Sequence, residues 1–127
     1  MNTPFVRRSV LVVDDVPGNV ESIAMLLRRH NVRTALSGID ALRLIEQAIP
    51  DVVLLDIGMP EMDGLEVARR IRERWGKDIF LVAITGYGME DDYRKTEEAG
   101  FDRHIVKPYE PEDLLQIVES PQRKGGE

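Results

Sequence analysis

The sequence contains no cysteine, few aromatic residues and no long apolar run, and each absence excludes a class of protein. Without cysteine, the chain forms neither disulfides nor thiolate metal sites, and it has no thiol nucleophile. Aromatic residues make up only 6% of the chain, so the core must be built from aliphatic side chains. The apolar run Val10–Val13 is ended at once by Asp14, which makes it too short for a signal peptide or a membrane span. We therefore expect a cytoplasmic protein with no membrane partner.

The length and charge of the chain narrow the possibilities further. The 127 residues make up about one domain, and 43% apolar with 31% charged residues is typical of a globular one. The net charge of −6 at pH 7 disfavours binding to a phosphate backbone, so we expect no nucleic-acid partner. We predict one domain over residues 9–119, an N-terminal extension over 1–8 and a flexible, polar C-terminal tail over 120–127.

Short apolar runs alternate along the chain with segments of helical periodicity. The runs are typical of strands that are buried on both faces, and they are Val10–Val13, Val32–Leu36, Val52–Leu55, Ile79–Ile84 and Arg103–Val106. The segment from Glu90 to Ala99 is mostly polar but still helical in pattern, and Gly100 is placed to end it. Five successive βα units predict an α/β fold with a five-stranded parallel sheet, right-handed crossovers and helices on both faces.

Reactive side chains come directly after four of the five apolar runs. Asp14 and Asp15 follow the first run, and Asp56 follows the third. Thr85 follows the fourth run and Lys107 follows the fifth. The carboxyl ends of parallel strands meet at one edge of the sheet, which is the edge where such sheets bind ligands. These residues, although far apart in the sequence, are therefore expected to converge on one crevice.

The charges of this group predict a metal site. Three carboxylates a few ångströms apart repel one another by roughly 4 kcal/mol per pair at 4 Å and an effective dielectric constant near 20. One lysine does not neutralise them, whereas a lysine and a divalent cation together do. An all-oxygen ligand set favours Mg²⁺ or Mn²⁺, and no histidine- or thiolate-rich site is indicated.

The chemistry that fits this group is phosphoryl transfer. Asp56 would be the nucleophile that forms an acyl phosphate. Lys107 would contact one phosphoryl oxygen, and the Thr85 hydroxyl would donate to another. The added negative charge would draw Thr85 and its loop inward, so that a local electrostatic change becomes a conformational one.

Four segments resemble the receiver domain of two-component response regulators. They are LVVDD (Leu11–Asp15), VVLLDIGMPEMDG (Val52–Gly64), AITG (Ala83–Gly86) and Lys107-Pro108, and they span nearly the whole chain in the order of the family. The resemblance implies a flavodoxin-like fold with strand order 2-1-3-4-5. It also implies a phosphorelay switch, phosphorylated on Asp56 by a histidine kinase or a histidine phosphotransfer protein, and not a turnover enzyme.

The resemblance assigns roles to individual residues. Asp15 looks like the direct carboxylate ligand of the metal, and Asp14 looks like a residue that acts through a metal-bound water. The backbone carbonyl of Gly58 would be the third protein ligand, beside Asp56. Thr85 matches the hydroxyl that senses the phosphoryl group. Lys107 matches the invariant lysine of the family, and a cis bond between it and the following proline is implied as well.

One position departs from the family pattern. His104 stands three residues before the lysine, where the family often has a tyrosine or phenylalanine that turns inward on phosphorylation. A histidine there could act as the switch and add pH sensitivity, or it could be a spectator. Tyr87 and Gly58 occupy variable positions that influence the lifetime of the phosphoryl group in the family. The downstream target is expected to bind through the region 90–119.

Other segments resemble the receivers of hybrid sensor kinases. These segments are the TGYG turn (Thr85–Gly88) and the run Gly100–Pro108. The chain would then be either a stand-alone regulator or an excised receiver, and the sequence leaves both open.

Simpler interpretations exist for each of these residues. Adjacent aspartates after a strand are often turn or helix-cap residues, and Thr85 and Lys107 could be a turn hydroxyl and a solvated charge. Their joint occurrence at four strand ends favours function over coincidence. His30 is interpreted as a helix-end residue. The helix after Gly64 carries a charged face that is interpreted as solvated, with recognition of a partner as the less favoured alternative, and this face consists of Arg69, Arg70, Arg72 and Arg74.

Two other functional classes are considered. An aspartate-nucleophile phosphatase needs an acid–base aspartate two residues after the nucleophile, and Gly58 stands there instead. A receiver that works only as a phosphorylation-independent interaction module would not need all five reactive residues. His104 nevertheless keeps that alternative open, because the site could be phosphorylated without transmitting the change.

Overall fold

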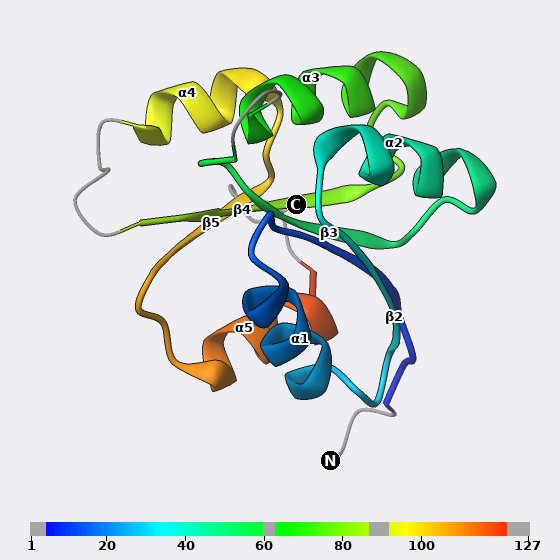
Figure 1. Ribbon diagram of the computed structural model, residues 1–127, viewed down its shortest axis with the longest axis vertical. Helices are drawn as coiled ribbons and strands as arrows, with labels where there is room; N and C mark the ends of the chain where they lie inside the picture. Colours follow the sequence, from blue (N-terminus) through cyan, green and yellow to red (C-terminus); the bar gives the residue numbers. More distant parts are fainter. Residues whose placement is uncertain (1–4, 60–62, 87–91, 122–127) are drawn as a thin grey trace.

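The computed structural model describes residues 5–59, 63–86 and 92–121, and Tyr87, Gly88, Glu90 and most of the expected tail lie outside this range. Strands and helices alternate strictly along the chain (Figure 1). The strands are β1 (Ser9–Val13), β2 (Asn31–Ala35), β3 (Val52–Asp56), β4 (Phe80–Thr85) and β5 (Arg103–Val106). The helices are α1 (Pro17–Leu26), α2 (Gly38–Gln47), α3 (Gly64–Trp75), α4 (Asp92–Ala99) and α5 (Pro111–Glu119). The predicted elements are therefore present, with bounds shifted by a few residues.

The strands form one parallel sheet in the order β2-β1-β3-β4-β5, which confirms the predicted topology. Figure 1 shows α1 and α5 on one face of the sheet and α2, α3 and α4 on the other. β1 pairs with both β2 and β3, so the chain reverses its direction of winding between these neighbours. Open α/β sheets bind ligands at this kind of switch point.

Alternate residues of the strands fill two separate layers of core. Leu11, Val53 and Leu81 point to the layer beneath α2, α3 and α4. Val12 and Leu54 point to the layer beneath α1 and α5. The side-chain period of 2 along a strand produces this division, and burial on both faces explains the continuous apolar runs in the sequence.

Local capping determines where several helices begin and end. The Asp63 carboxylate accepts a hydrogen bond from the Glu66 N–H and caps α3, as its sequence position indicates. Pro17 occupies the first turn of α1, where its missing N–H costs no hydrogen bond. Gly100 follows α4 with a φ of 106°, a conformation that glycine adopts readily, which confirms the expected end of this helix. No helix in the described residues is long and apolar enough to cross a membrane.

His30 has a different role from the one its position suggested. α1 ends at Leu26, and His30 lies beyond it, buried before β2. Its Nδ1 accepts a hydrogen bond from the Arg8 N–H at 3.0 Å, and its Nε2 lies 3.3 Å from Glu119 Oε2. Because a backbone N–H only donates, a neutral His30 ring carries its proton on Nε2. The ring therefore links the segment before β1 to the end of α5.

Arg72 is not part of a solvated face. Its guanidinium donates to the carbonyls of Gly100 at 2.9 Å and of Gly76 and Ile79 at 2.7 Å each. It also forms an ion pair with Asp102, with Nη2 2.8 Å from Oδ2. The interpretation from the sequence is wrong at this position, because the side chain joins the end of α3 to the start of β4 and to the loop after α4.

Candidate functional site

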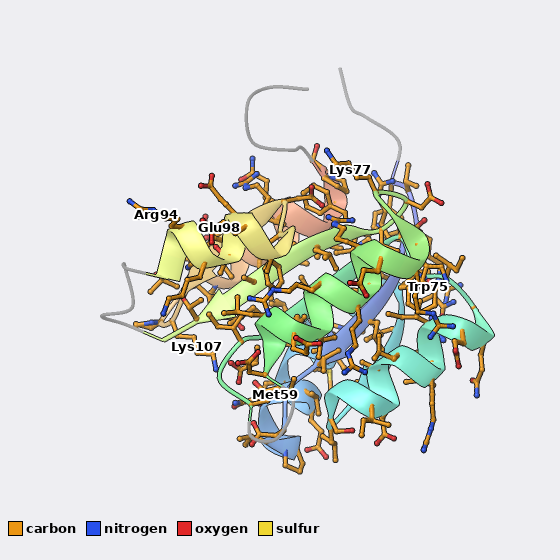
Figure 2. All side chains as sticks on the ribbon, turned by 90° about the horizontal axis from the view of Figure 1, so that it is seen from above. Met59, Trp75, Lys77, Arg94, Glu98 and Lys107 are labelled. Carbon is orange, nitrogen blue, oxygen red and sulfur yellow. The ribbon has the colours of Figure 1, made fainter. Side chains whose placement is uncertain are left out.

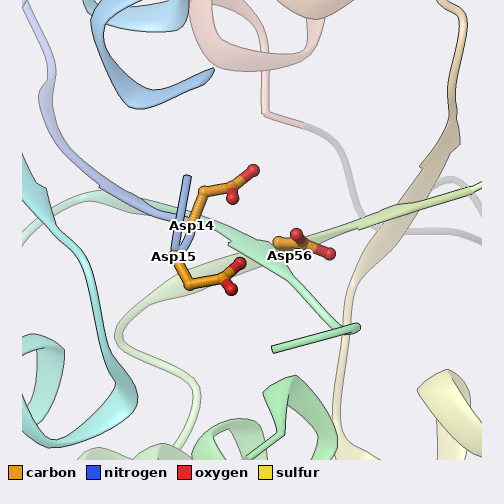
Figure 3. Close-up of side chains that lie close together, drawn as sticks. All are labelled: Asp14, Asp15 and Asp56. Atoms are coloured by element: carbon orange, nitrogen blue, oxygen red, sulfur yellow. The ribbon is translucent and has the colours of Figure 1, made fainter. Parts of the chain in front are cut away.

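Three aspartates meet at the carboxyl edge of the sheet (Figure 3). Asp14 and Asp15 follow β1, and Asp56 is the last residue of β3, the strand that pairs with β1. One carboxylate oxygen from each residue lies within 4.8 Å of the others. Asp14 is buried, Asp56 is partly buried and Asp15 is exposed. The predicted convergence of these residues is present in the structure.

Asp14 is held in place through both of its oxygens. Oδ1 accepts a hydrogen bond from the Val16 N–H at 2.9 Å, and Oδ2 accepts one from Asn19 Nδ2 at 3.1 Å. Lys107 Nζ lies 3.8 Å from the same Oδ2. Asn19, in the first turn of α1, was not singled out in the sequence. The signal that the sequence offered for Asn19 was its position, one helical turn after the acidic pair Asp14 and Asp15.

Burial raises the pKa of the Asp56 carboxyl above its ordinary value. The charge of Asp14 raises it further, and that of Asp15 adds a smaller effect in the same direction. A hydrogen bond from the Gly58 N–H to Asp56 Oδ1, 2.9 Å long, and the charge of Lys107 act in the opposite direction. The ionised carboxylate is thus less stable here than in water, and a cation bound to the site would offset this cost.

The raised pKa of the Asp56 carboxyl predicts that Asp56→Asn stabilises the metal-free protein. At neutral pH the unfolded chain holds Asp56 ionised at no cost, whereas the folded chain holds it ionised at a cost in free energy. The neutral amide removes that cost, so we expect the free energy of unfolding to rise by about 1 kcal/mol, after a discount for partial exposure. Urea denaturation in chelator at pH 7 measures it.

The gain from Asp56→Asn should shrink as the pH falls through the raised pKa, because the wild-type carboxyl then becomes protonated in the folded state. Asp51→Asn is a control outside the acidic group. Asp51 accepts a hydrogen bond from the Ser9 N–H at 2.8 Å, so its replacement should not stabilise the fold. Equal or lower stability of the Asp56 variant in chelator would contradict the electrostatic account.

The donor chemistry of the site fits a hard divalent cation. The side-chain atoms of the cluster that could bind a metal are all carboxylate oxygens. Lys107 offsets only one of the three negative charges, so the cluster keeps excess negative charge. Asp15 is exposed, so a hydrated ion can reach it from solvent. Mg²⁺ keeps several waters and binds through one or two carboxylates, which this arrangement can supply.

Lys107 lies at the same edge of the sheet as the aspartates. Its N–H donates to the Thr85 carbonyl at 2.8 Å, so the ends of β4 and β5 stay together. The Lys107–Pro108 bond is cis, as the family resemblance implies. Figure 2 looks onto the face covered by α2, α3 and α4. In this projection Lys107 lies at the end of the sheet where α3 begins, and Trp75 and Lys77 lie at the opposite end.

The Thr85 hydroxyl forms a hydrogen bond with the His104 ring. Thr85 Oγ1 lies 2.9 Å from His104 Nε2, and His104 Nδ1 lies 3.2 Å from Thr96 Oγ1 on α4. Asp56 pairs in register with Ile84, the residue before Thr85, so this hydroxyl is carried by the strand beside the aspartates. The hydroxyl contact of Thr96 depends on a partner from the strand β5, which no local sequence pattern reveals.

The fold and the site together define a class: a doubly wound parallel α/β domain with a cluster of three aspartates and a lysine at the carboxyl edge of its sheet. The family model described as the response regulator receiver domain matches residues 10–119. The chain belongs to this family. It is therefore a receiver-domain signalling protein of two-component systems, a family that generally binds Mg²⁺ through acidic residues and interacts with histidine kinases and downstream effectors.

Individual relatives agree with this assignment. The chain is 36% identical over 125 residues to hybrid signal transduction histidine kinase L of Dictyostelium discoideum, covering 91% of this chain and 7% of that protein. It is 34% identical over 120 residues to the DNA-binding response regulator MtrA of Mycolicibacterium smegmatis, covering 93% of this chain and 52% of that one. The chain thus spans about half or less of these two relatives.

A solved structure has the same fold over nearly its entire length. The chemotaxis protein CheY4 of Vibrio cholerae superposes with a TM-score of 0.83 at 28% identity, over 89% of this chain and 97% of that one. The strand order and the helices on both faces are therefore those of a receiver domain.

Proposed function

We propose that this protein accepts a phosphoryl group from a phosphohistidine donor onto Asp56, in a Mg²⁺-dependent reaction, and then changes its partner-binding surface. The observation that carries the proposal is the acidic group itself. Three carboxylates lie within 4.8 Å of one another, with Lys107 3.8 Å from Asp14. Such an arrangement is costly unless it binds a cation and the group that the cation helps to transfer.

In the proposed reaction, a carboxylate oxygen of Asp56 attacks the phosphorus atom of the donor. The P–N bond of the phosphohistidine breaks, and its electron pair stays on the donor imidazole. A cation bound by the aspartates would neutralise part of the negative charge on the transferred group. Lys107 contacts an equatorial phosphoryl oxygen, and the Gly58 N–H, which already donates to Asp56 Oδ1, orients the nucleophile.

The contacts of the aspartates support different roles for the two residues after β1. Asp15 is exposed and is the carboxylate proposed to bind the metal directly. Both oxygens of Asp14 already accept hydrogen bonds from Val16 and Asn19, so a contact through metal-bound water suits this residue better. The backbone carbonyl of Gly58 is proposed as the remaining protein ligand, beside Asp56.

The proposed output surface is the region 90–119, of which the structure describes residues 92–119. A hollow of about 420 Å³ lies there, and its lining includes Arg103, His104, Asp113 and Gln116. His104 lines this hollow and is also bonded to Thr85, the proposed phosphoryl sensor. The same residue therefore lies between the site and a surface where a downstream protein could bind. We place this switch in the cytoplasm, with a histidine kinase or phosphotransfer protein as the donor.

The central test is intact mass after incubation with Mg²⁺ and a small acyl-phosphate donor. We expect a gain of one phosphoryl group in the wild type, and no gain in chelator or in Asp56→Asn. Asp51 lies directly before β3 and therefore at the opposite edge of the sheet, so Asp51→Asn should take up the label like the wild type. If quenched wild-type protein takes no label from this donor or from a phosphohistidine protein, and also binds no phosphomimetic metal fluoride, the switch fails and an interaction module remains.

Steady phosphate release from small phosphate esters would contradict the proposal in another way. Such turnover would indicate a phosphatase. Gly58 occupies the position where that class needs an acid–base carboxyl group, so we expect no turnover above the rate of autodephosphorylation.

A further inference from the structure

The side chain of Asn19, in the first turn of α1, holds one of the three aspartates of the site. Asn19 Nδ2 donates to Asp14 Oδ2 at 3.1 Å, and the Val16 N–H donates to Oδ1 of the same carboxylate at 2.9 Å. Asparagine is a poorer helix former than leucine or alanine, so the stability of α1 does not account for its presence here. What the Asn19 side chain contributes is therefore the contact with Asp14.

The oxygen that Asn19 holds also lies near the lysine of the site. Lys107 Nζ is 3.8 Å from Asp14 Oδ2, which is close enough for an ion pair but too long for a hydrogen bond. The Asp14 side chain is 3% exposed, and a buried carboxylate oxygen needs a hydrogen-bond donor. Asn19 supplies that donor without adding a charge, so Asp14 does not depend on Lys107 for one.

Without the Asn19 amide, the arrangement of Asp14 and Lys107 would change. Two hydrogen bonds, one to each oxygen, fix the plane of the Asp14 carboxylate. If the Val16 bond alone remained, the carboxylate could turn about its Cβ–Cγ bond toward Lys107, whose side chain is 36% exposed and has room to move. A bond between two charged groups is shorter and stronger than one to a neutral amide, so we expect the 3.8 Å separation to close to about 2.8 Å.

Lys107 also acts on Asp56, the proposed phosphoacceptor. Its charge acts to lower the pKa of the Asp56 carboxyl, against the larger effect of burial. In the proposed reaction its ammonium group contacts an oxygen of the phosphoryl group. An ammonium group bonded to Asp14 would first have to leave that carboxylate, and this separation would add to the barrier of the transfer. A lysine that stays unbound by Asp14 avoids this cost.

We propose that Asn19 is a positioning residue, which keeps Lys107 available for the phosphoryl group by occupying the Asp14 oxygen that the lysine would otherwise bind. The inference rests on the proposed function, because Lys107 is needed there as a contact of the phosphoryl group. Asn19 acts through Asp14 and Lys107 and does not itself contact the transferred group. The contacts that carry the inference exist without metal, so the metal-free protein can show them.

The first test is NMR of the lysine ammonium groups in the metal-free protein, which requires no phosphoryl transfer. An ammonium group bonded to a carboxylate exchanges its protons with water more slowly than a solvated one. The chain has four lysines, and Lys107→Met identifies the Lys107 signal by its loss. In Asn19→Leu we expect proton exchange at Lys107 to slow at least threefold. Unchanged or faster exchange would overturn the inference.

Two further variants separate the hydrogen-bond donor from the size of the side chain. Leucine is close to asparagine in size and alanine is smaller, but both lack the donor, so Asn19→Ala should slow the exchange as Asn19→Leu does. A response in one of the two variants alone would indicate packing and would contradict the proposed role. The matched control is Asn31→Leu, at an exposed position where β2 begins, which should leave the exchange at Lys107 unchanged.

The second test is a double-mutant cycle on the rate of phosphoryl uptake from a small acyl-phosphate donor, with donor and Mg²⁺ at saturation. We expect Asn19→Leu alone to lower this rate at least tenfold. In a Lys107→Met background no ammonium group can be drawn to Asp14, so the same substitution should change the residual rate less than twofold. An equal loss in both backgrounds would show that Asn19 does not act through Lys107, and would overturn the inference.

The two tests distinguish failure of the inference from failure of the proposed function. If the wild type takes up no phosphoryl group from this donor or from a phosphohistidine protein, the proposed function is wrong, and the inference is wrong with it. If the wild type is phosphorylated and either contrary result is found, the inference alone is wrong.

Discussion

Replacing Arg72 by methionine is expected to lower the free energy of unfolding by about 3 to 5 kcal/mol, the range found when one partner of a buried ion pair is removed. The Asp102 side chain is only 8% exposed, so its carboxylate would stay buried after losing the ion pair with Arg72. The Gly100 and Ile79 carbonyls would also lose a donor. Methionine keeps much of the volume of the arginine stem, so packing changes little. Urea denaturation measures the loss.

Arg69→Met is the matched control on the same helix. Arg69 is 52% exposed, and among the residues that the structure describes it pairs with Glu66 alone, at 3.4 Å, so its loss should cost at most about 1 kcal/mol. A second comparison isolates the charge of Asp102. Asp102 also accepts from the Leu81 N–H at 2.9 Å, and asparagine retains that acceptor. Arg72→Met combined with Asp102→Asn should therefore be more stable than Arg72→Met alone. Equal losses for Arg69 and Arg72 would contradict the anchoring role.

Replacing Gly64 by alanine is expected to destabilise the fold by roughly 1 to 3 kcal/mol, the cost of inserting a methyl group into a packed position. A Cβ at Gly64 would lie 2.5 Å from the Ile57 Cα and 2.7 Å from the Asp56 carbonyl oxygen. Both are backbone atoms, so the segment that carries the proposed phosphoacceptor would have to move. We also expect weaker binding of Mg²⁺, measured by calorimetry.

Gly18→Ala is the matched control, because Gly18 and Gly64 both lie in the first turn of a helix. A Cβ at Gly18 would meet no atom within 4 Å. Alanine is the better helix former by about 1 kcal/mol, so this variant should be neutral or slightly more stable. If the two substitutions had the same effect on stability and on Mg²⁺ binding, the loss in Gly64→Ala could not be attributed to the close approach of α3 to the backbone of Asp56 and Ile57.

Much of the fold could be predicted from the sequence, because its signals are local. A strand that is buried on both faces needs a continuous apolar run, and β1 and β3 show this directly. The edge of the sheet where ligands bind is also defined by chain direction alone. Asp14, Asp15 and Asp56 could therefore be placed together from the sequence, since each lies at the carboxyl end of a strand of one parallel sheet.

The contacts that hold and connect the site were decided by tertiary structure. Asn19 reaches Asp14 and Thr96 reaches His104 only because helices cross the sheet at particular positions and rotations. Arg72 has the same local pattern as the exposed arginines of α3, and only the loop that ends in Asp102, 30 residues later, makes it a buried anchor. The sequence determined the elements and the reactive edge, since periodicity and chain direction are encoded residue by residue. Partner choice among polar side chains depends on packing across the sheet, which no local pattern contains.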